Sequence, residues 1–294
     1  MKRDEYDALW MRPHGLPLTG QGRTLAIIDQ PLWKESPAYR SNLANDIGKP
    51  IEGESMHGAA VTSIAVGNLG VAPNAKIAYC AIETWHGRET LLKNHAQALR
   101  DLQAYVKAGN NIDAVSTSHG WMPHEEGSQE NNNIIYWFEK RNIPVFSSLE
   151  KFIYMCGLQG AATTYLERSN PVPSCREDQV AIPVDNRLIA NRNQHDIDAN
   201  GGNFYCRIQT GGMSWAIPFV AGLFTLARES KQDISRQEFF YVLSKTARLV
   251  DFGNGCHLPT ADINAFCNEV ISCPMRRDRG ALLNIRNYIN QPRS

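Results

Sequence analysis

Short apolar segments alternate with longer segments of helical periodicity along most of this chain, and this alternation constrains the fold more than any other feature. Buried strands are predicted at residues 23–28, 75–82, 112–120, 143–149 and 180–184. Helices are predicted at residues 57–66, 90–109, 210–229 and 233–250. Such an order favours an α/β fold of three layers, in which a mostly parallel, twisted sheet carries helices on both faces.

The helix predicted at 233–250 has a clear start signal. Ser235 stands at the N-cap position and Glu238 follows three residues later, which is the pattern of a capping box. No internal repeat, low-complexity tract or linker divides the 294 residues. We therefore expect a single domain over 1–294, ending at about 274–294 in a basic tail, which is expected to be a solvated terminal helix rather than a binding arm.

Charge and hydropathy exclude several partners. The 30 basic and 30 acidic residues balance, so nothing in the charge indicates nucleic acid or an anionic membrane. The first residues lack the apolar segment of a signal peptide, and no run of 18 apolar residues occurs, so we expect an intracellular protein that does not enter a membrane. The seven cysteines have irregular spacing without a CxxC pair, which predicts reduced, buried thiols, no metal site and no cofactor.

Three polar residues stand at the predicted ends of elements: Asp29 after a strand, and His57 and Ser214 at helix starts. Each taken singly is more often a turn or cap residue. Taken together they have the chemistry of a nucleophile, its general base and the carboxylate that orients the base. Their order differs from the serine-first order of α/β-hydrolases and from the histidine-first order of chymotrypsin-like enzymes.

Nearly the whole chain resembles the subtilisin-like serine proteases, in which the triad has the order Asp, His, Ser. The resemblance lies in six stretches in the order of that family: TGQGRTLAIID at 19–29, HGAAVTSIA at 57–65, GVAPNAKIAYCAI at 70–82, IDAVSTSHG at 112–120, GMSWAIPFVAG at 212–222 and TADINAFCNEV at 260–270. It implies a subtilisin-like fold and a serine endopeptidase, with Ser214 as nucleophile, His57 as general base and Asp29 as its orienting partner.

The resemblance also implies a polypeptide substrate bound as an extended strand. Its backbone would pair with Ser118, His119 and Gly120 on one side and with residues 86–88 on the other. The segment Ser147, Ser148 and Leu149 would form a second part of the substrate site.

Two positions depart from the family pattern at the oxyanion hole. Glu150 aligns with the asparagine that donates a hydrogen bond to the oxyanion, and Met213 takes the place of a threonine before the nucleophile. Loss of such a donor slows an enzyme by about 10² to 10³. The sequence leaves open whether a protonated Glu150 or a replacement donor serves the oxyanion. It also leaves open a dormant, peptide-binding pseudoprotease and an acyl-transfer enzyme that joins peptides. An active but atypical protease is favoured, because the triad is complete.

Overall fold

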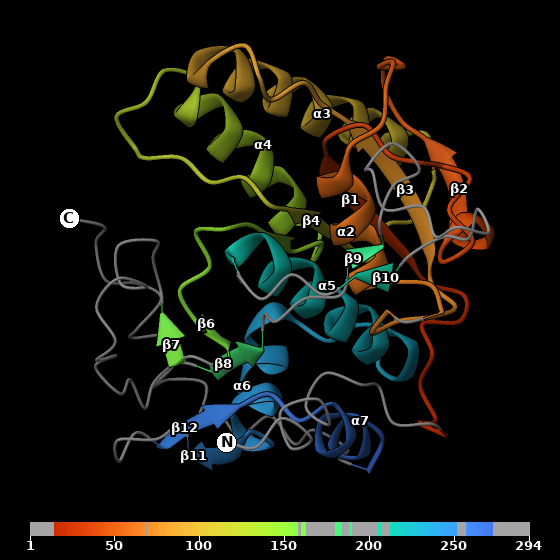
Figure 1. Cartoon of the computed structure of the whole chain (residues 1–294), viewed down its shortest axis with the longest axis vertical. Helices are drawn as coiled ribbons and strands as arrows, with labels where there is room; N and C mark the ends of the chain where they lie inside the picture. The colour runs from red at the N-terminus through yellow and green to blue at the C-terminus, as the bar shows by residue number, and fades with distance from the viewer. Residues whose placement is uncertain are drawn as a thin grey trace.

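The protein is described by a computed structural model, which covers residues 15–68, 70–157, 160–162, 180–183, 188–189, 205–206, 212–251 and 257–272 (Figure 1). A five-stranded parallel sheet carries the sequence motifs. In spatial order its strands are β2 (Leu43–Asp46), β3 (Lys76–Ala81), β1 (Thr24–Asp29), β4 (Ala114–Thr117) and β5 (Val145–Phe146). The mostly parallel α/β architecture predicted from the sequence is confirmed.

Helices cover both faces of this sheet. They are α2 (Met56–Ala65), α3 (Arg88–Lys107), α4 (Ser128–Glu139), α5 (Met213–Ser230), α6 (Arg236–Lys245) and α7 (Ile263–Ser272), and a short 3-10 helix, η1, spans Arg40–Asn42. Leu25 and Ile27 of β1 belong to a core shared with α2, α5, α6 and α7. Ala26 and Ile28, on the opposite face of the same strand, pack against α3 and α4. These three layers place the carboxyl end of β1 between two separate hydrophobic cores.

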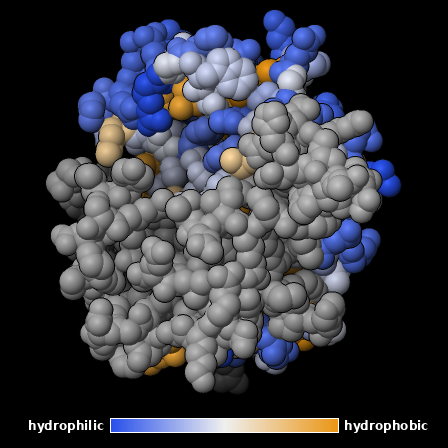
Figure 2. Space-filling model, viewed as in Figure 1, coloured by the Kyte–Doolittle hydropathy of each residue, from blue (hydrophilic) through white to orange (hydrophobic). Residues whose placement is uncertain are grey.

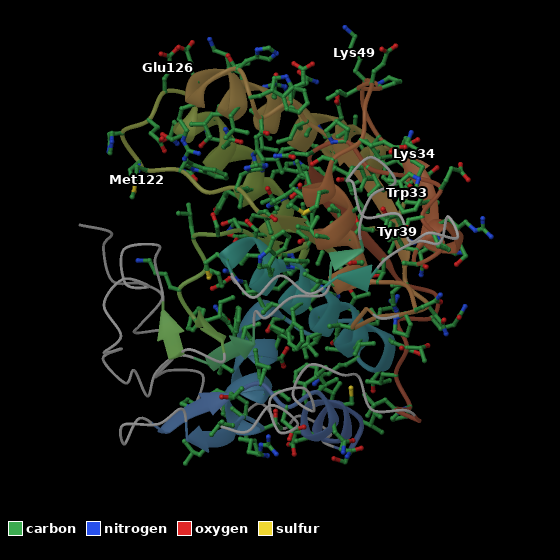
Figure 3. All side chains as sticks on the ribbon, viewed as in Figure 1. Trp33, Lys34, Tyr39, Lys49, Met122 and Glu126 are labelled. Carbon is green, nitrogen blue, oxygen red and sulfur yellow. The ribbon has the colours of Figure 1, made fainter. Side chains whose placement is uncertain are left out.

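Hydrophilic residues predominate on the outer surface of the layer formed by α3 and α4, with a few apolar residues among them (Figure 2). Met122 and Glu126 project outward from the loop that joins β4 to α4 (Figure 3). The inner face of α3 is apolar, with Leu92, Leu99 and Leu102 fully buried. The period of these leucines is that of an amphipathic helix packed on a sheet.

A second sheet lies beyond the first and mixes strand directions. Its order is β11 (Arg248–Asp251), β12 (His257–Thr260), β8 (Val180–Pro183), β6 (Ile153–Gly157) and β7 (Gly160–Ala162). A two-stranded ribbon pairs β10 (Tyr205–Cys206) with β9 (Leu188–Ile189). Among the described helices, none combines the length and the apolar character of a membrane span. The predicted basic tail at 274–294 lies outside the described residues.

Three predicted elements are wrong in extent, and one of them, the strand expected at 143–149, is limited to Val145–Phe146. The helix expected at 233–250 ends at Lys245, and Arg248–Asp251 forms a strand antiparallel to β12 instead. Thr246 is the C-cap residue of this helix, and its hydroxyl donates to the Val242 carbonyl at 2.8 Å. The strand expected at 112–120 ends at Thr117, so residues 118–120 continue past the sheet without a neighbouring strand among the described residues. The capping box of Ser235 and Glu238 is confirmed.

Candidate active site

Asp29 and His57 meet at the carboxyl end of β1. Asp29 is the last residue of that strand and is fully buried, and its Oδ1 lies 2.6 Å from His57 Nδ1. Ser55 caps α2 by accepting from the His57 N–H at 3.1 Å, which fixes His57 in the first turn. At Gly58 a Cβ atom would lie 2.5 Å from the Gln30 carbonyl oxygen, so only glycine lets α2 approach this closely.

The electrostatics of this pair suit a general base. Burial by itself raises the pKa of Asp29, but the His57 ring, His119 and the Gln30 N–H, which donates to Oδ1 at 2.8 Å, together hold that pKa below its usual range. Burial by itself lowers the pKa of His57, yet the charge and hydrogen bond of Asp29 keep it above its ordinary value. The pair therefore keeps Asp29 ionised and makes the imidazole a stronger base.

Gln30, the residue directly after Asp29, supports this geometry. Its side chain binds the Ser55 hydroxyl and donates to Thr84 Oγ1 at 2.9 Å. Its carbonyl oxygen accepts from the Tyr79 hydroxyl at 2.5 Å. These contacts join the loop after β1 to the N-cap of α2, which supports the Asp29 to His57 contact.

Ser214 lies in the first turn of α5, one residue before Trp215, whose ring packs near the His57 ring. The N-cap Gly212 is extended, and Met213 begins the helix and packs on the large core. Ser118 Oγ donates to the Ser214 carbonyl at 3.3 Å, and the Trp215 ring lies 5.0 Å from the His57 ring between centroids. Within the described residues, Ser214 Oγ makes no hydrogen bond of its own. Ser214 is thus brought to the edge of the sheet with its backbone N–H at a helix N-terminus.

The predicted substrate segments follow two adjacent strands. Ser118, His119 and Gly120 come directly after β4, and Ser147, Ser148 and Leu149 come directly after β5. The carboxyl ends of parallel strands at this edge are where ligands bind in open α/β sheets. The two segments touch, since a Cβ atom at Gly120 would lie 2.5 Å from Ser148 Oγ and 3.0 Å from Leu149 Cδ2.

Arg88 joins two parts of the predicted substrate site. Its guanidinium donates to the Gly120 carbonyl oxygen and pairs with Glu125, with Nε 2.6 Å from Oε1. Glu125 in turn accepts from the Met122 N–H. The segment at 118–120 is therefore bound to the start of α3 and to its own following loop.

A chain of buried hydrogen bonds supports the same segment from the α3 and α4 layer. Asn131 donates its amide to the carbonyls of Leu92 and Gly127, at 3.0 and 2.9 Å, so its oxygen accepts from His95 Nδ1 at 2.6 Å. The other ring nitrogen of His95 accepts from Thr117 Oγ1 at 2.8 Å. Thr117, the last residue of β4, is held in place by this chain.

His95 was missed as a site-supporting residue by the sequence analysis, although a signal existed. It lies on the apolar face of α3 with Leu91 and Leu99, where a histidine needs buried partners. Burial lowers the pKa of His95 to about 4, even though the Asn131 hydrogen bond acts in the opposite direction. The ring is therefore neutral, as its two hydrogen bonds require.

We expect the His95 environment to make stability depend on pH. A histidine with a pKa of 6.5 unfolded and about 4 folded binds more protons unfolded, so its contribution is complete above pH 6.5 and is lost as the pH falls toward 4. The free energy of unfolding should fall by about 3 kcal/mol through this one group between pH 7 and pH 4. Urea unfolding of the wild type and of His95→Gln at both pH values measures the difference. Equal pH dependence in the two proteins would contradict this account.

The Glu150 side chain is directed toward α6. Its side chain is 1% exposed, and one carboxyl oxygen binds the Arg236 guanidinium. The other accepts from the N–H groups of Lys151 and Phe152, at 3.0 and 3.3 Å. Arg236 also pairs with Glu139 at 3.0 Å. The Glu150 carboxyl thus accepts from three donors, the Arg236 guanidinium and two backbone N–H groups.

The described part of the chain contains no group of three or more His, Cys, Asp or Glu side chains placed to hold a metal ion. Cys80 and Cys267, both in described helices or strands, are buried free thiols. Cys80 is packed among the apolar side chains between the sheet and α3. Burial raises the pKa of its thiol, so it is unsuited to act as a thiolate.

The architecture and the residues at its edge define an α/β protein with the subtilisin-like protease fold. Solved protease domains share it. A protease from Pseudoalteromonas arctica is 16% identical with a TM-score of 0.62, and the match covers 90% of this chain and 97% of that one. The self-cleaved protease domain of PatA is 16% identical with a TM-score of 0.58 over 88% of this chain and all of that one, 100%.

A lanthipeptide protease shares the fold as well, at 18% identity and a TM-score of 0.57, over 85% of this chain and 90% of that one. No protein-family model and no curated protein sequence matches the chain. Identities this low establish the fold, whereas activity has to be argued from the residues of the site.

Proposed function

We propose that this protein is a serine endopeptidase that hydrolyses peptide bonds through an acyl-enzyme on Ser214. The observation that carries the proposal is the 2.6 Å contact between the fully buried Asp29 and His57, directly beside the helix whose first turn holds Ser214. A buried carboxylate bonded to a histidine fixes the tautomer in which the other ring nitrogen is free to accept a proton.

In the proposed reaction, His57 takes the hydroxyl proton as Ser214 Oγ attacks the peptide carbonyl. The tetrahedral intermediate collapses as the C–N bond breaks, and His57 gives its proton to the departing amine. Water then repeats the sequence on the ester and releases the acid. The Ser214 backbone N–H at the α5 N-terminus would donate to the oxyanion. Asp29 remains ionised throughout, in keeping with its lowered pKa.

A second donor at the oxyanion is not supplied by Glu150, because its carboxyl is occupied by Arg236 and two backbone N–H groups. A missing side-chain donor slows turnover by about 10² to 10³. The same observation supports one alternative, a pseudoprotease that binds an extended peptide without cleaving it. Efficient turnover by the unaltered protein would reject that alternative, and peptide affinity without turnover would support it.

A fluorophosphonate probe tests the proposal without knowledge of the substrate. The probe should label the wild type at Ser214, as serine oxygen displaces fluoride from phosphorus, and should leave Ser214→Ala unlabelled. Ser272→Ala, which removes an exposed hydroxyl at the end of α7, is a matched control and should be labelled like the wild type. Absence of labelling at every pH from about 5 to 9 would contradict the proposal.

A further inference from the structure

The two segments beside Ser214 leave little room between them. Ser118 Oγ contacts the Ser214 carbonyl, so the 118–120 segment runs next to the proposed nucleophile. The 147–149 segment follows the neighbouring strand, and its Ser148 and Leu149 side chains reach across to the Gly120 backbone. Even one added methyl group at Gly120 would overlap with them.

Both segments are held in place, so neither can withdraw at low cost. Arg88 binds the Gly120 carbonyl oxygen, and Thr117 is bonded to the buried His95. On the other side, the Glu150 N–H donates to the Ser147 carbonyl at 2.9 Å, closing a tight turn. The Glu150 carboxyl is in turn bound by Arg236.

A peptide that pairs as a strand with residues 118–120 directs alternate side chains to opposite sides. The residue whose carbonyl reaches Ser214 would then direct its side chain between the 118–120 and 147–149 segments. Leu149 extends toward the 118–120 segment, since its Cδ2 would lie 3.0 Å from a Cβ atom at Gly120, and 40% of its surface is exposed. A large substrate side chain and the Leu149 side chain exclude one another there.

We infer that Leu149 restricts cleavage to bonds that follow a small residue, glycine or alanine. This inference rests on the proposed endopeptidase function and adds the substrate class to it. Leu149 acts on specificity by filling space, and it takes no part in the chemistry. The occluded volume is that of one aliphatic side chain, and a difference of about one methylene group in such a pocket changes selectivity by about 10- to 200-fold.

The test compares peptides that carry glycine, alanine, leucine or phenylalanine before the scissile bond. The wild type should cleave after glycine and alanine at least about 10-fold faster, in kcat/KM, than after leucine or phenylalanine. Leu149→Gly should reverse this order of kcat/KM, because cleavage after leucine and phenylalanine becomes faster. Leu249→Ala, which removes a side chain 71% exposed on β11, is the matched control and should keep the wild-type preference.

Probe labelling of Ser214 in all three proteins separates the two proposals. Labelling with equal rates of cleavage after glycine and phenylalanine in the wild type would overturn the inference and leave the endopeptidase proposal standing. A preference for small residues that persists in Leu149→Gly, with folding verified by thermal unfolding, would also overturn it. No labelling in any of them would overturn both.

Discussion

Asp29→Asn is expected to slow acylation of Ser214 by about 10⁴-fold, because the loss of an orienting carboxylate in such a triad has an effect of that size. Asp29 is fully buried, and its Oδ1 is the acceptor for His57 Nδ1. An asparagine keeps the volume but removes the charge that holds the imidazole ready to take a proton. The rate of fluorophosphonate labelling measures the effect. Asp46→Asn, at an exposed ion pair with Lys34, should leave that rate unchanged.

The pH profile of labelling gives a second reading of the same contact. Only neutral His57 can accept the serine proton, so the rate should rise with pH through the pKa of His57. Because Asp29 raises that pKa, the rise should be centred above the ordinary histidine value of 6.5. In Asp29→Asn the residual rate should rise at lower pH. An Asp29→Asn profile that rises at the wild-type pH would show that Asp29 does not set the basicity of His57.

Arg236→Met is expected to lower the free energy of unfolding by about 3 kcal/mol, because it leaves the buried Glu150 carboxylate without its cation. The Glu150 side chain is 1% exposed, and only two backbone N–H groups would remain as donors. Arg236 itself is 33% exposed, so water moderates the loss. Urea unfolding at neutral pH measures the change.

The double variant Glu150→Gln with Arg236→Met provides the control for this prediction. Removal of both charges should recover much of the stability that Arg236→Met alone loses. If the double variant is no more stable than Arg236→Met, the lost stability comes from packing of the arginine stem on Phe146 and Phe240, whose rings lie 5.8 Å from the guanidinium.

The sequence was sufficient to predict the parallel sheet and the placement of Asp29, His57 and Ser214 at element ends, because strand and helix periodicities are local. The contact between Asp29 and His57, 28 residues apart, followed from the order of motifs. The pairing of Glu150 with Arg236 was not predicted, because Arg236 lies 86 residues away and the sequence does not reveal which side of its helix faces Glu150.

Other features escaped prediction for related physical reasons. The pairing of His95 with Asn131 and Thr117 joins three elements, so the periodicity of α3 indicates a buried histidine but does not identify its partners. The short segment at 248–250 suits either the end of a helix or a strand by its sequence, and in the structure it pairs with β12 as a strand. His119 was expected inside the strand at 112–120 but lies beyond the end of β4, and its buried Nε2 has no hydrogen-bond partner among the described residues.

The proposed catalytic groups and the proposed substrate-binding segment are supported from opposite faces of the sheet. Asp29 and His57, with the start of α5, belong to the side covered by α2 and α5, whereas Thr117 and Gly120 are held by His95 and Arg88 of α3. If only the α3 and α4 layer unfolds, we therefore expect the protein to lose binding of the proposed polypeptide substrate before Ser214 loses its reactivity. As mild denaturant is added, labelling of Ser214 by a small phosphonylating probe should persist after peptide cleavage is lost. The difference between the two denaturant concentrations would measure how independently the two layers unfold.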